Sequence, residues 1–248
     1  MKIIKIKTNN RTKQHKVVSE TKWLAARKAL LAKEKKFSRL GDELNLQRRK
    51  LPWVKVEKAY VFDGPKGSET LAELFDGKSQ LLVYHFMFGP GWKDGCPHCS
   101  FWADHFDSVG VHIRQRDTSF LVISRAPLKE IAPFKKRMGW RFKWVSSFKN
   151  DFNFDYHVSF TKEEIKSGTL FYNYGKFRMK IDELQGVSAF YKDGKGDVYH
   201  TYSTYARGID LMNGTYNFLD MTAKGRDEHP EHTQDWVRYH DRYKGGKQ

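Results

Sequence analysis

The chain has 248 residues and a mass of 29.2 kDa, and 39% of its residues are hydrophobic. This is enough apolar surface for a folded core and excludes a disordered protein. The formal charge of +16 is concentrated at one end, because residues 1–60 hold 18 Lys and Arg against 5 Asp and Glu, so the rest of the chain is not a general nucleic-acid-binding surface. No apolar run has the length of a signal peptide or a membrane span, and we therefore expect a cytoplasmic protein without a membrane partner.

Residues 1–52 are predicted to form a basic leader and an amphipathic helical arm. Ser19 or Thr21 can cap a helix whose apolar residues recur at spacings of three, four and seven from Trp23 to Leu44. A break is expected near Ser38 or Gly41. The apolar stripe predicts packing on the rest of the chain or pairing with a second subunit in a homodimer, rather than binding to nucleic acid.

Residues 53–223 are predicted to form one α/β domain. Its first half has strand-like and helix-like segments in alternation, which is typical of parallel crossover units. The segments are a strand ending at Phe62, a turn over 63–67, a short helix over 68–75, a buried strand over 80–88, a helix from Cys96 that carries Phe101, Trp102 and Phe106, a buried strand over 119–124 and a helix through Ile131, Phe134 and Met138. The stretch from Trp140 to Tyr156 has no clear pattern.

The second half of this domain begins with an expected insertion over residues 160–183. A helical patch over 162–166 and a Tyr-rich loop over 172–175 lie within it. The pattern then predicts a hairpin of two strands, 186–191 and 198–202, and a helix over 209–219. Residues 224–248 are expected to be a solvated, charged C-terminal tail with a short helix over 236–243.

Both cysteines of the chain lie in one stretch, Gly95-Cys96-Pro97-His98-Cys99, which follows a buried strand and a glycine-rich turn. A helix N-terminus favours a thiolate, so we expect Cys96 to be the nucleophile and the more buried Cys99 to resolve a mixed disulfide. Pro97 fits the first helical position. His98 adds positive charge that stabilises the reduced form, which favours an oxidant or a sensor over a reductant.

Two other interpretations of the cysteine pair are weaker. The first is that the two thiols are buried and have no chemical role, but this does not explain why the cysteines lie after a buried strand and at the start of a helix. A zinc site needs three or four ligands, and His98 cannot readily share one with both neighbouring thiolates, so no metal is expected. The tail residues His229, His232 and His240 with Glu228 and Glu231 could hold a metal adventitiously, although a solvated tail is the simpler interpretation.

The order of strand, CxxC-capped helix, parallel strand, helix, hairpin and final helix is that of the thioredoxin fold. The strand and turn before it resemble the N-terminal extension of peroxiredoxins. More specifically, the chain resembles an uncharacterised thioredoxin-like family of predicted dithiol-disulfide oxidoreductases. The resemblance rests on Leu51-Pro52-Trp53, His85-Phe86-Met87-Phe88-Gly89, Gly95 to Phe101, Ser124 to Leu128, Gly186-Val187-Ser188 and His200 to Gly208.

This resemblance implies thiol–disulfide exchange without a cofactor, and two departures from related families limit it. The loop at Gly186-Val187-Ser188 lacks the proline that thioredoxins place opposite the CxxC. The positions three and seven before Cys96 are Lys93 and Gly89, so the Pro and Thr or Ser of a peroxiredoxin peroxide site are missing.

Several further residues are candidates for a supporting role. Arg125 follows the second parallel strand, at the sheet edge where α/β proteins place their sites, and could hold a carboxylate or stabilise the thiolate, or simply be ion-paired. Ser188 is a second supporting candidate. Weaker candidates for substrate binding are Trp92, Tyr202, Tyr205 and Arg207.

We therefore expect a thioredoxin-fold enzyme that exchanges its CxxC with a thiol or disulfide substrate, most simply a protein, through an unidentified electron donor. One alternative is a thiol peroxidase that lacks the usual threonine. Another is a non-catalytic thioredoxin-fold module that binds a partner through its basic N-terminal helix.

Overall fold

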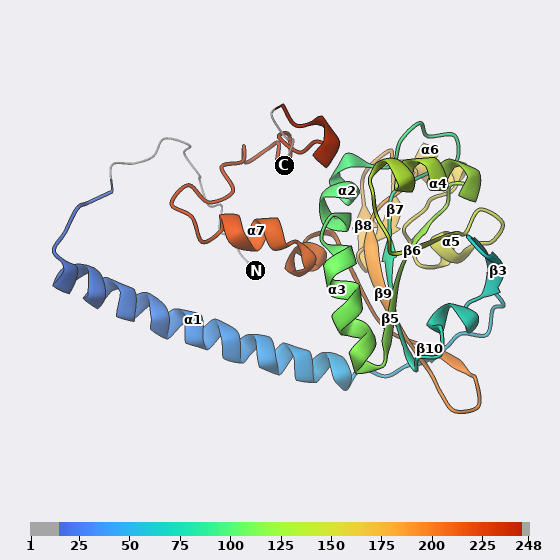
Figure 1. Cartoon of the computed structure of the whole chain (residues 1–248), viewed down its shortest axis with the longest axis horizontal. Helices are drawn as coiled ribbons and strands as arrows, with labels where there is room; N and C mark the ends of the chain where they lie inside the picture. Colours follow the sequence, from blue (N-terminus) through green and yellow to red (C-terminus); the bar gives the residue numbers. More distant parts are fainter. Residues whose placement is uncertain (1–14, 245–248) are drawn as a thin grey trace. The chain divides into compact units, whose positions relative to one another are not determined.

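The computed structural model describes residues 15–244 (Figure 1). The chain divides into two compact units: the described residues up to Pro52 together with Asp227–Thr233, and Trp53–Arg226 together with the described residues from Gln234 onward. Most of the predicted basic leader, residues 1–14, lies outside the described residues. None of the helices that are described is long and apolar enough to cross a membrane.

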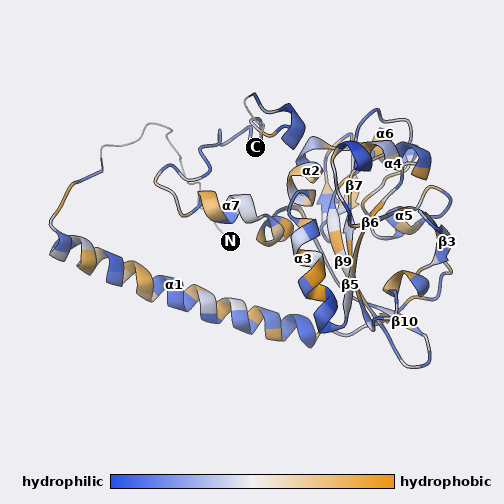
Figure 2. Cartoon of the chain, in the orientation of Figure 1, coloured by the Kyte–Doolittle hydropathy of each residue, from blue (hydrophilic) through white to orange (hydrophobic). Residues whose placement is uncertain are grey.

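The smaller unit contains one long helix, α1 (Glu20–Arg49). Ser19 caps it as predicted, since its side chain accepts a hydrogen bond from the Lys22 amide at 3.5 Å. The expected break near Ser38 or Gly41 is wrong: the helix is continuous, and the Ser38 hydroxyl donates to the Glu34 carbonyl one turn earlier. Apolar and polar residues are interspersed along α1 (Figure 2), and none of its residues is buried.

The larger unit is built on an eight-stranded sheet in the order β1-β10-β9-β4-β5-β6-β2-β3. These strands are β1 (Val54–Lys55), β2 (Val61–Gly64), β3 (Gly67–Thr70), β4 (Gln80–His85), β5 (Thr118–Ser124), β6 (Lys143–Ser146), β9 (Gly186–Lys192) and β10 (Val198–Tyr205). A separate two-stranded sheet pairs β7 (Leu170–Tyr172) with β8 (Gly175–Phe177).

The helical segments of this unit are short. They are η1 (Glu73–Phe75), α2 (Pro97–Ala103), α3 (Phe106–Ile113), η2 (Arg114–Arg116), α4 (Leu128–Arg137), α5 (Phe152–Asp155), α6 (Lys162–Ser167), η3 (Ala206–Met212), α7 (Gly214–Leu219) and η4 (His240–Arg242), where η marks a 3-10 helix.

The topology of the central strands is that of a thioredoxin-like fold. β4 pairs in parallel with β5, which pairs in parallel with β6, whereas β9 is antiparallel to β4 and β10 is antiparallel to β9. The predicted hairpin is therefore confirmed as β9–β10. The hairpin of β2 and β3 adds to the outer edge of β6, in the manner of the predicted peroxiredoxin-like extension. The strand that leads into the CxxC is thus central in the sheet.

Residues of β4 point alternately to the two faces of the sheet and define two apolar cores. Tyr84 and Phe86 join a core that contains both cysteines and the buried residues of α2 and α4, whereas Leu81 and Val83 join a core with η1 and α5. Figure 1 shows α2 and α3 on one side of the sheet and α5 on the other. The cysteines therefore lie on one defined face.

Three local predictions differ from the structure, and one stretch without a clear pattern contains regular elements. Residues 67–70 form a strand, not the start of a helix, because the turn after β2 closes a hairpin. The stretch without a clear pattern, from Trp140 to Tyr156, contains β6 and α5. The helix expected over 209–219 is divided into η3 and α7, because the side chain of Asn213 caps α7 by accepting from the Tyr216 amide. The last segment of the chain is not a solvated tail: Val237 is buried in the core that contains the cysteines.

Candidate active site

Cys96 is the N-cap of α2, and Pro97 occupies the first turn of that helix. The loop that leads to it is anchored to the end of β4, since the Cys96 amide donates to the Met87 carbonyl at 3.0 Å. The Ser100 hydroxyl and amide both return to the Cys96 carbonyl, at 2.9 and 3.0 Å. Among the first-turn amides, that of Cys99 acts on the Cys96 sulfur and helps to lower its pKa.

Gly95 is required before the motif for a steric reason. A Cβ at this position would lie 2.6 Å from the Phe86 ring and 2.9 Å from the Phe134 ring, both of which belong to the aromatic core under α2. No side chain fits in that space. The glycine therefore lets the loop lie directly on the core, so that Cys96 begins the helix close to the carboxyl end of β4.

The two thiols have opposite electrostatics. The interaction with the Cys99 side chain, followed by that with His98, holds the pKa of Cys96 well below its usual range, although burial opposes this. Burial, followed by the hydrogen bond with Cys96, raises the pKa of Cys99 well above its usual range. Cys96 is 9% exposed and Cys99 is fully buried. The lower of the two pKa values therefore belongs to the thiol nearer the surface.

His98 faces Cys96 from the first turn of α2. The hydrogen bond with Cys96 raises the pKa of His98, as do the Gln234 backbone and the charge of Asp235, while partial burial opposes the shift. His98 is an exposed side chain, so its charge is partly screened by solvent. The His98 imidazole and the Cys96 sulfur therefore shift each other's pKa in opposite directions.

The C-terminal segment packs against the start of α2. Tyr239 donates its hydroxyl hydrogen to the Gly95 carbonyl at 2.7 Å, and His240 pairs with Asp104 at 2.7 Å. A hollow of about 350 Å³ lies between this segment and the CxxC, lined by Pro97, His98, Gln234, Asp235, Val237, Arg238, Tyr239 and Arg242. A larger, mostly apolar hollow of about 450 Å³ is lined by none of the CxxC residues. The smaller one is therefore bordered by the first turn of α2, although neither cysteine lines it.

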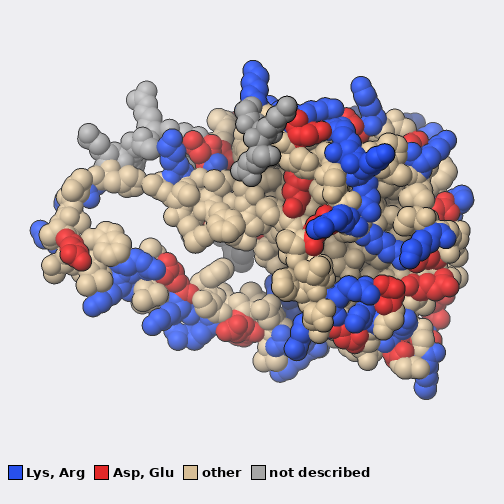
Figure 3. Space-filling model, in the orientation of Figure 1, with Lys and Arg blue, Asp and Glu red and all other residues tan. Residues whose placement is uncertain are grey.

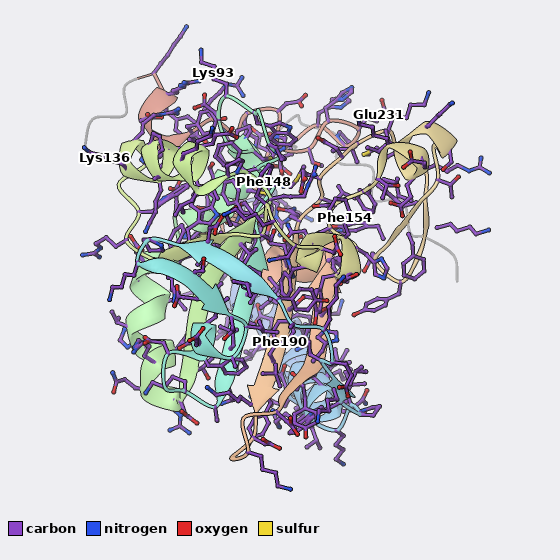
Figure 4. All side chains as sticks on the ribbon, turned by 90° about the vertical axis from the view of Figure 1, so that its right-hand side faces the viewer. Lys93, Lys136, Phe148, Phe154, Phe190 and Glu231 are labelled. Carbon is purple, nitrogen blue, oxygen red and sulfur yellow. The ribbon has the colours of Figure 1, made fainter. Side chains whose placement is uncertain are left out.

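Arg125 is ion-paired. Its Nε lies 2.7 Å from Oε1 of Glu183, a carboxylate that is fully buried and also accepts from the Ser159 hydroxyl at 2.7 Å. The guanidinium lies 5.0 Å from the ring centroid of Phe154, which is labelled on α5 in Figure 4. Burial raises the pKa of Glu183 to about 7 in spite of the arginine. This arrangement corresponds to the simpler of the two interpretations of Arg125.

Ser188 lies on β9 in a buried polar chain. Its hydroxyl lies 2.8 Å from His85 Nε2 and 2.8 Å from the Ser203 hydroxyl, which in turn lies 2.7 Å from His200 Nε2. His85 stacks on Phe152, which belongs to the core on the face opposite the cysteines. The structure therefore does not bring Ser188 together with the CxxC.

The weaker candidates are dispersed. Trp92 lies in the loop after Gly89 and packs on the core that contains the cysteines. Its neighbour Lys93, which is labelled in Figure 4, is exposed. Tyr205 is buried and donates to the Tyr156 carbonyl at 3.0 Å. Tyr202 lies half-buried on β10, and Arg207 is exposed and pairs with Asp210 at 3.3 Å. Of these four candidates, Trp92 alone packs on the core of the cysteines.

Two residues beside Cys99 were not predicted from the sequence. The Cys99 thiol donates to the Gln185 side-chain oxygen at 3.5 Å, and the Tyr84 hydroxyl donates to the same oxygen at 2.9 Å. The Met87 amide donates to the Cys99 sulfur at 3.4 Å. The alternation along β4 places Tyr84 on the same face as Phe86 and was a usable signal, but no local pattern marks Gln185.

Charged side chains of both signs are distributed over the described part of the larger unit. On the face of the larger unit visible in Figure 3, Lys and Arg are interspersed with Asp and Glu. Within residues 15–244, one group of side chains could hold a metal ion: His229, Glu231 and His232, whose ligand atoms lie within 4.8 Å of one another and which are all exposed. His240 is not part of that group.

The fold and this cysteine pair define a thioredoxin-fold protein with a CxxC at the N-terminus of the helix that follows the central strand. Residues 12–243 match the family model described as bacterial protein of unknown function (DUF899), and the chain belongs to that family. No curated protein matches the sequence.

Several solved structures are similar in fold. Peroxidoxin BcpB from Mycobacterium tuberculosis is 14% identical over 68% of this chain and 97% of its own, with a TM-score of 0.42. Peroxiredoxin Q from Xanthomonas campestris is 12% identical over 66% and 90%, with a TM-score of 0.45. A candidate thiol:disulfide interchange protein DsbE from Chlorobium tepidum is 12% identical over 71% and 100%, with a TM-score of 0.40.

Proposed function

We propose that the protein is a dithiol–disulfide oxidoreductase in which Cys96 attacks and Cys99 resolves. The observation that carries the proposal is that the pKa values of the two thiols at the start of α2 are shifted in opposite directions. The pKa of Cys96 is lowered by Cys99 and His98, and the pKa of Cys99 is raised by burial. Thiol–disulfide exchange needs one thiolate that is ready to attack and a second thiol that stays protonated until a mixed disulfide has formed.

The exchange proceeds in two balanced steps. The Cys96 thiolate attacks one sulfur of a substrate disulfide, which forms a Cys96–substrate disulfide and releases the first substrate thiolate. Cys99 then loses its proton and attacks the Cys96 sulfur, which forms the Cys96–Cys99 bond and releases the second substrate thiolate. The substrate is reduced by two electrons and the protein is oxidised. The same steps in reverse oxidise a dithiol substrate.

The environment of Cys96 favours the oxidising direction. Groups that stabilise the thiolate stabilise the reduced protein, so the disulfide form becomes a stronger oxidant. His98 and the helix N-terminus act in this sense on Cys96. We therefore expect a reduction potential above that of thioredoxin, about −270 mV.

The test combines trapping with a redox titration. A Cys99→Ser variant should accumulate mixed disulfides with protein or low-molecular-weight thiol substrates, and a Cys96→Ser variant, the matched control, should accumulate none. The wild-type protein should lose two hydrogen masses on oxidation. Equal amounts of mixed disulfide in both variants, or no Cys96–Cys99 disulfide in the wild-type protein at any potential, would overturn the proposal. The protein would then be interpreted as a binding module.

A peroxidase assay separates the remaining alternative. Lys93 and Gly89 stand where a peroxide site requires a hydroxyl residue and a proline, so we expect slow consumption of hydrogen peroxide. Rapid oxidation of Cys96 to a sulfenic acid by peroxide would instead favour a thiol peroxidase.

A further inference from the structure

Gln185 and Tyr84 surround the resolving thiol from two strands. Gln185 immediately precedes β9 and Tyr84 lies on β4, and the Gln185 side chain contacts Cys99 of α2. The Gln185 side-chain oxygen accepts from the Cys99 thiol and from the Tyr84 hydroxyl. The Tyr84 hydroxyl also lies beside Cys99 and acts to lower the pKa of that thiol, against the effect of burial. The three groups therefore form a triangle in which the Tyr84 and Cys99 hydrogens both point to the Gln185 oxygen, and Tyr84 and Cys99 are fully buried.

The insertion holds Gln185 in place. The Tyr172 hydroxyl, on β7, donates to the Gln185 backbone carbonyl at 2.7 Å and accepts from the Ala206 amide at 2.9 Å. Glu183, two residues earlier, is fixed by Arg125 and Ser159. Hydrogen bonds thus hold both the Gln185 backbone and the preceding Glu183 side chain, so the side-chain amide of Gln185 has a fixed position beside the Cys99 sulfur.

We propose that Gln185 and Tyr84 are positioning residues for the second step, in which the Gln185 oxygen retains the Cys99 proton while Cys96 reacts and the Tyr84 hydroxyl then donates to the emerging Cys99 thiolate. This inference rests on the proposed function. The negative end of the amide dipole favours the protonated thiol, because a thiolate would face it without a hydrogen. Tyr84 supplies the opposite interaction once the proton has left.

Tyr84 acts as a donor and not as a base. Burial raises the pKa of its hydroxyl well above the usual range, so the group stays protonated at every working pH. The other titratable groups that act on Cys99 are Cys96 at the start of α2 and Tyr172 on β7. In the second step the proton that leaves Cys99 is balanced by the proton that the released substrate thiolate takes up.

Two variants should shift Cys99 in opposite directions. Tyr84→Phe keeps the ring but removes the donor to the thiolate, so it should slow release of thionitrobenzoate from the Cys96 mixed disulfide by roughly tenfold. Gln185→Leu removes the amide dipole and leaves the Tyr84 hydroxyl to the sulfur alone, so it should speed that release by roughly threefold. Tyr60→Phe is the matched control, because Tyr60 is a buried tyrosine of the opposite core that donates to Asp155 at 2.7 Å.

A second measurement keeps this inference separate from the proposed function. In a Cys96→Ser background, the Cys99 titration followed by carbon NMR should move up in pH in Tyr84→Phe and down in Gln185→Leu, whether or not exchange occurs. Alkylation of Cys96 in a Cys99→Ser background should change by less than about twofold in either variant, because the triangle acts on Cys99. Shifts of the same sign, or none beyond that of Tyr60→Phe, would overturn the assignment.

Discussion

The buried pair of Arg125 and Glu183 gives a stability prediction whose magnitude follows from the structure. Arg125→Ala removes the cation and leaves the fully buried carboxyl with Ser159 as its remaining partner. Glu183→Gln is the companion change, since it removes the charge but keeps the shape. In wild type the pKa of Glu183 is about 7 against a usual 4.5, because burial outweighs the arginine.

The sign of the pH dependence follows from this difference. Between pH 4.5 and 7 the unfolded chain has lost the Glu183 proton while the folded chain keeps it. The stabilising contribution is therefore complete below pH 4.5 and is lost as the pH rises through 7. At 1.36 kcal/mol for each pKa unit, this single group changes the free energy of unfolding by about 3 kcal/mol across the window.

Arg125→Ala should destabilise the protein most where Glu183 is ionised in wild type. We expect a loss of about 3 kcal/mol at pH 8 and about 1 kcal/mol at pH 5, because the neutral carboxyl does not need the cation. A change of 3 kcal/mol corresponds to a fall in Tm of about 6–12 °C for a domain of this size. Glu183→Gln should flatten the dependence of stability on pH.

Urea unfolding of the three proteins at pH 5, 6, 7 and 8 measures these effects as differences from wild type. The m-value serves as a control, since an unchanged slope means that the same surface is exposed on unfolding. An Arg125→Ala loss that is equal at pH 5 and pH 8, or a Glu183→Gln profile as steep as that of wild type, would refute the reasoning about the buried carboxyl.

Three other changes test the site. His98→Ala should slow alkylation of Cys96 by iodoacetamide at pH 6 by a few-fold, because the positive charge that lowers the pKa of Cys96 is lost. The difference from wild type should vanish at pH 9.5. A difference that persists at pH 9.5 would mean that the substitution changes the access of iodoacetamide to Cys96 and not its pKa. Gly95→Ala should lower stability by about 1–3 kcal/mol, because its Cβ would overlap the Phe86 and Phe134 rings; thermal unfolding measures this, with exposed Gly194→Ala as the control, and equal effects would argue against the close approach. Tyr239→Phe should cost about 1 kcal/mol through loss of the bond to the Gly95 carbonyl and should speed alkylation of Cys96; an unchanged alkylation rate would mean that the C-terminal segment does not limit access to the thiol.

The central strand, the position of the cysteine pair and the β9–β10 hairpin could be predicted from local patterns along the chain. Each of these depends on neighbouring residues: an apolar run marks β4, Pro97 follows the capping Cys96, and turn residues separate β9 from β10. Such signals act over a few positions, so the periodicity and turn chemistry of the chain express them directly.

The residues that surround the two thiols could not be predicted in this way, because they come from distant parts of the chain. Gln185 is 86 positions from Cys99 and 101 from Tyr84, and Tyr239 is 144 positions from Gly95. These contacts form because the sheet order brings β9 beside β4 and the C-terminal segment returns to α2, and no local pattern encodes either event. The sequence likewise indicated Arg125 as a candidate because it follows β5. Its partner Glu183 lies 58 positions away, and the pairing could be identified only from the fold.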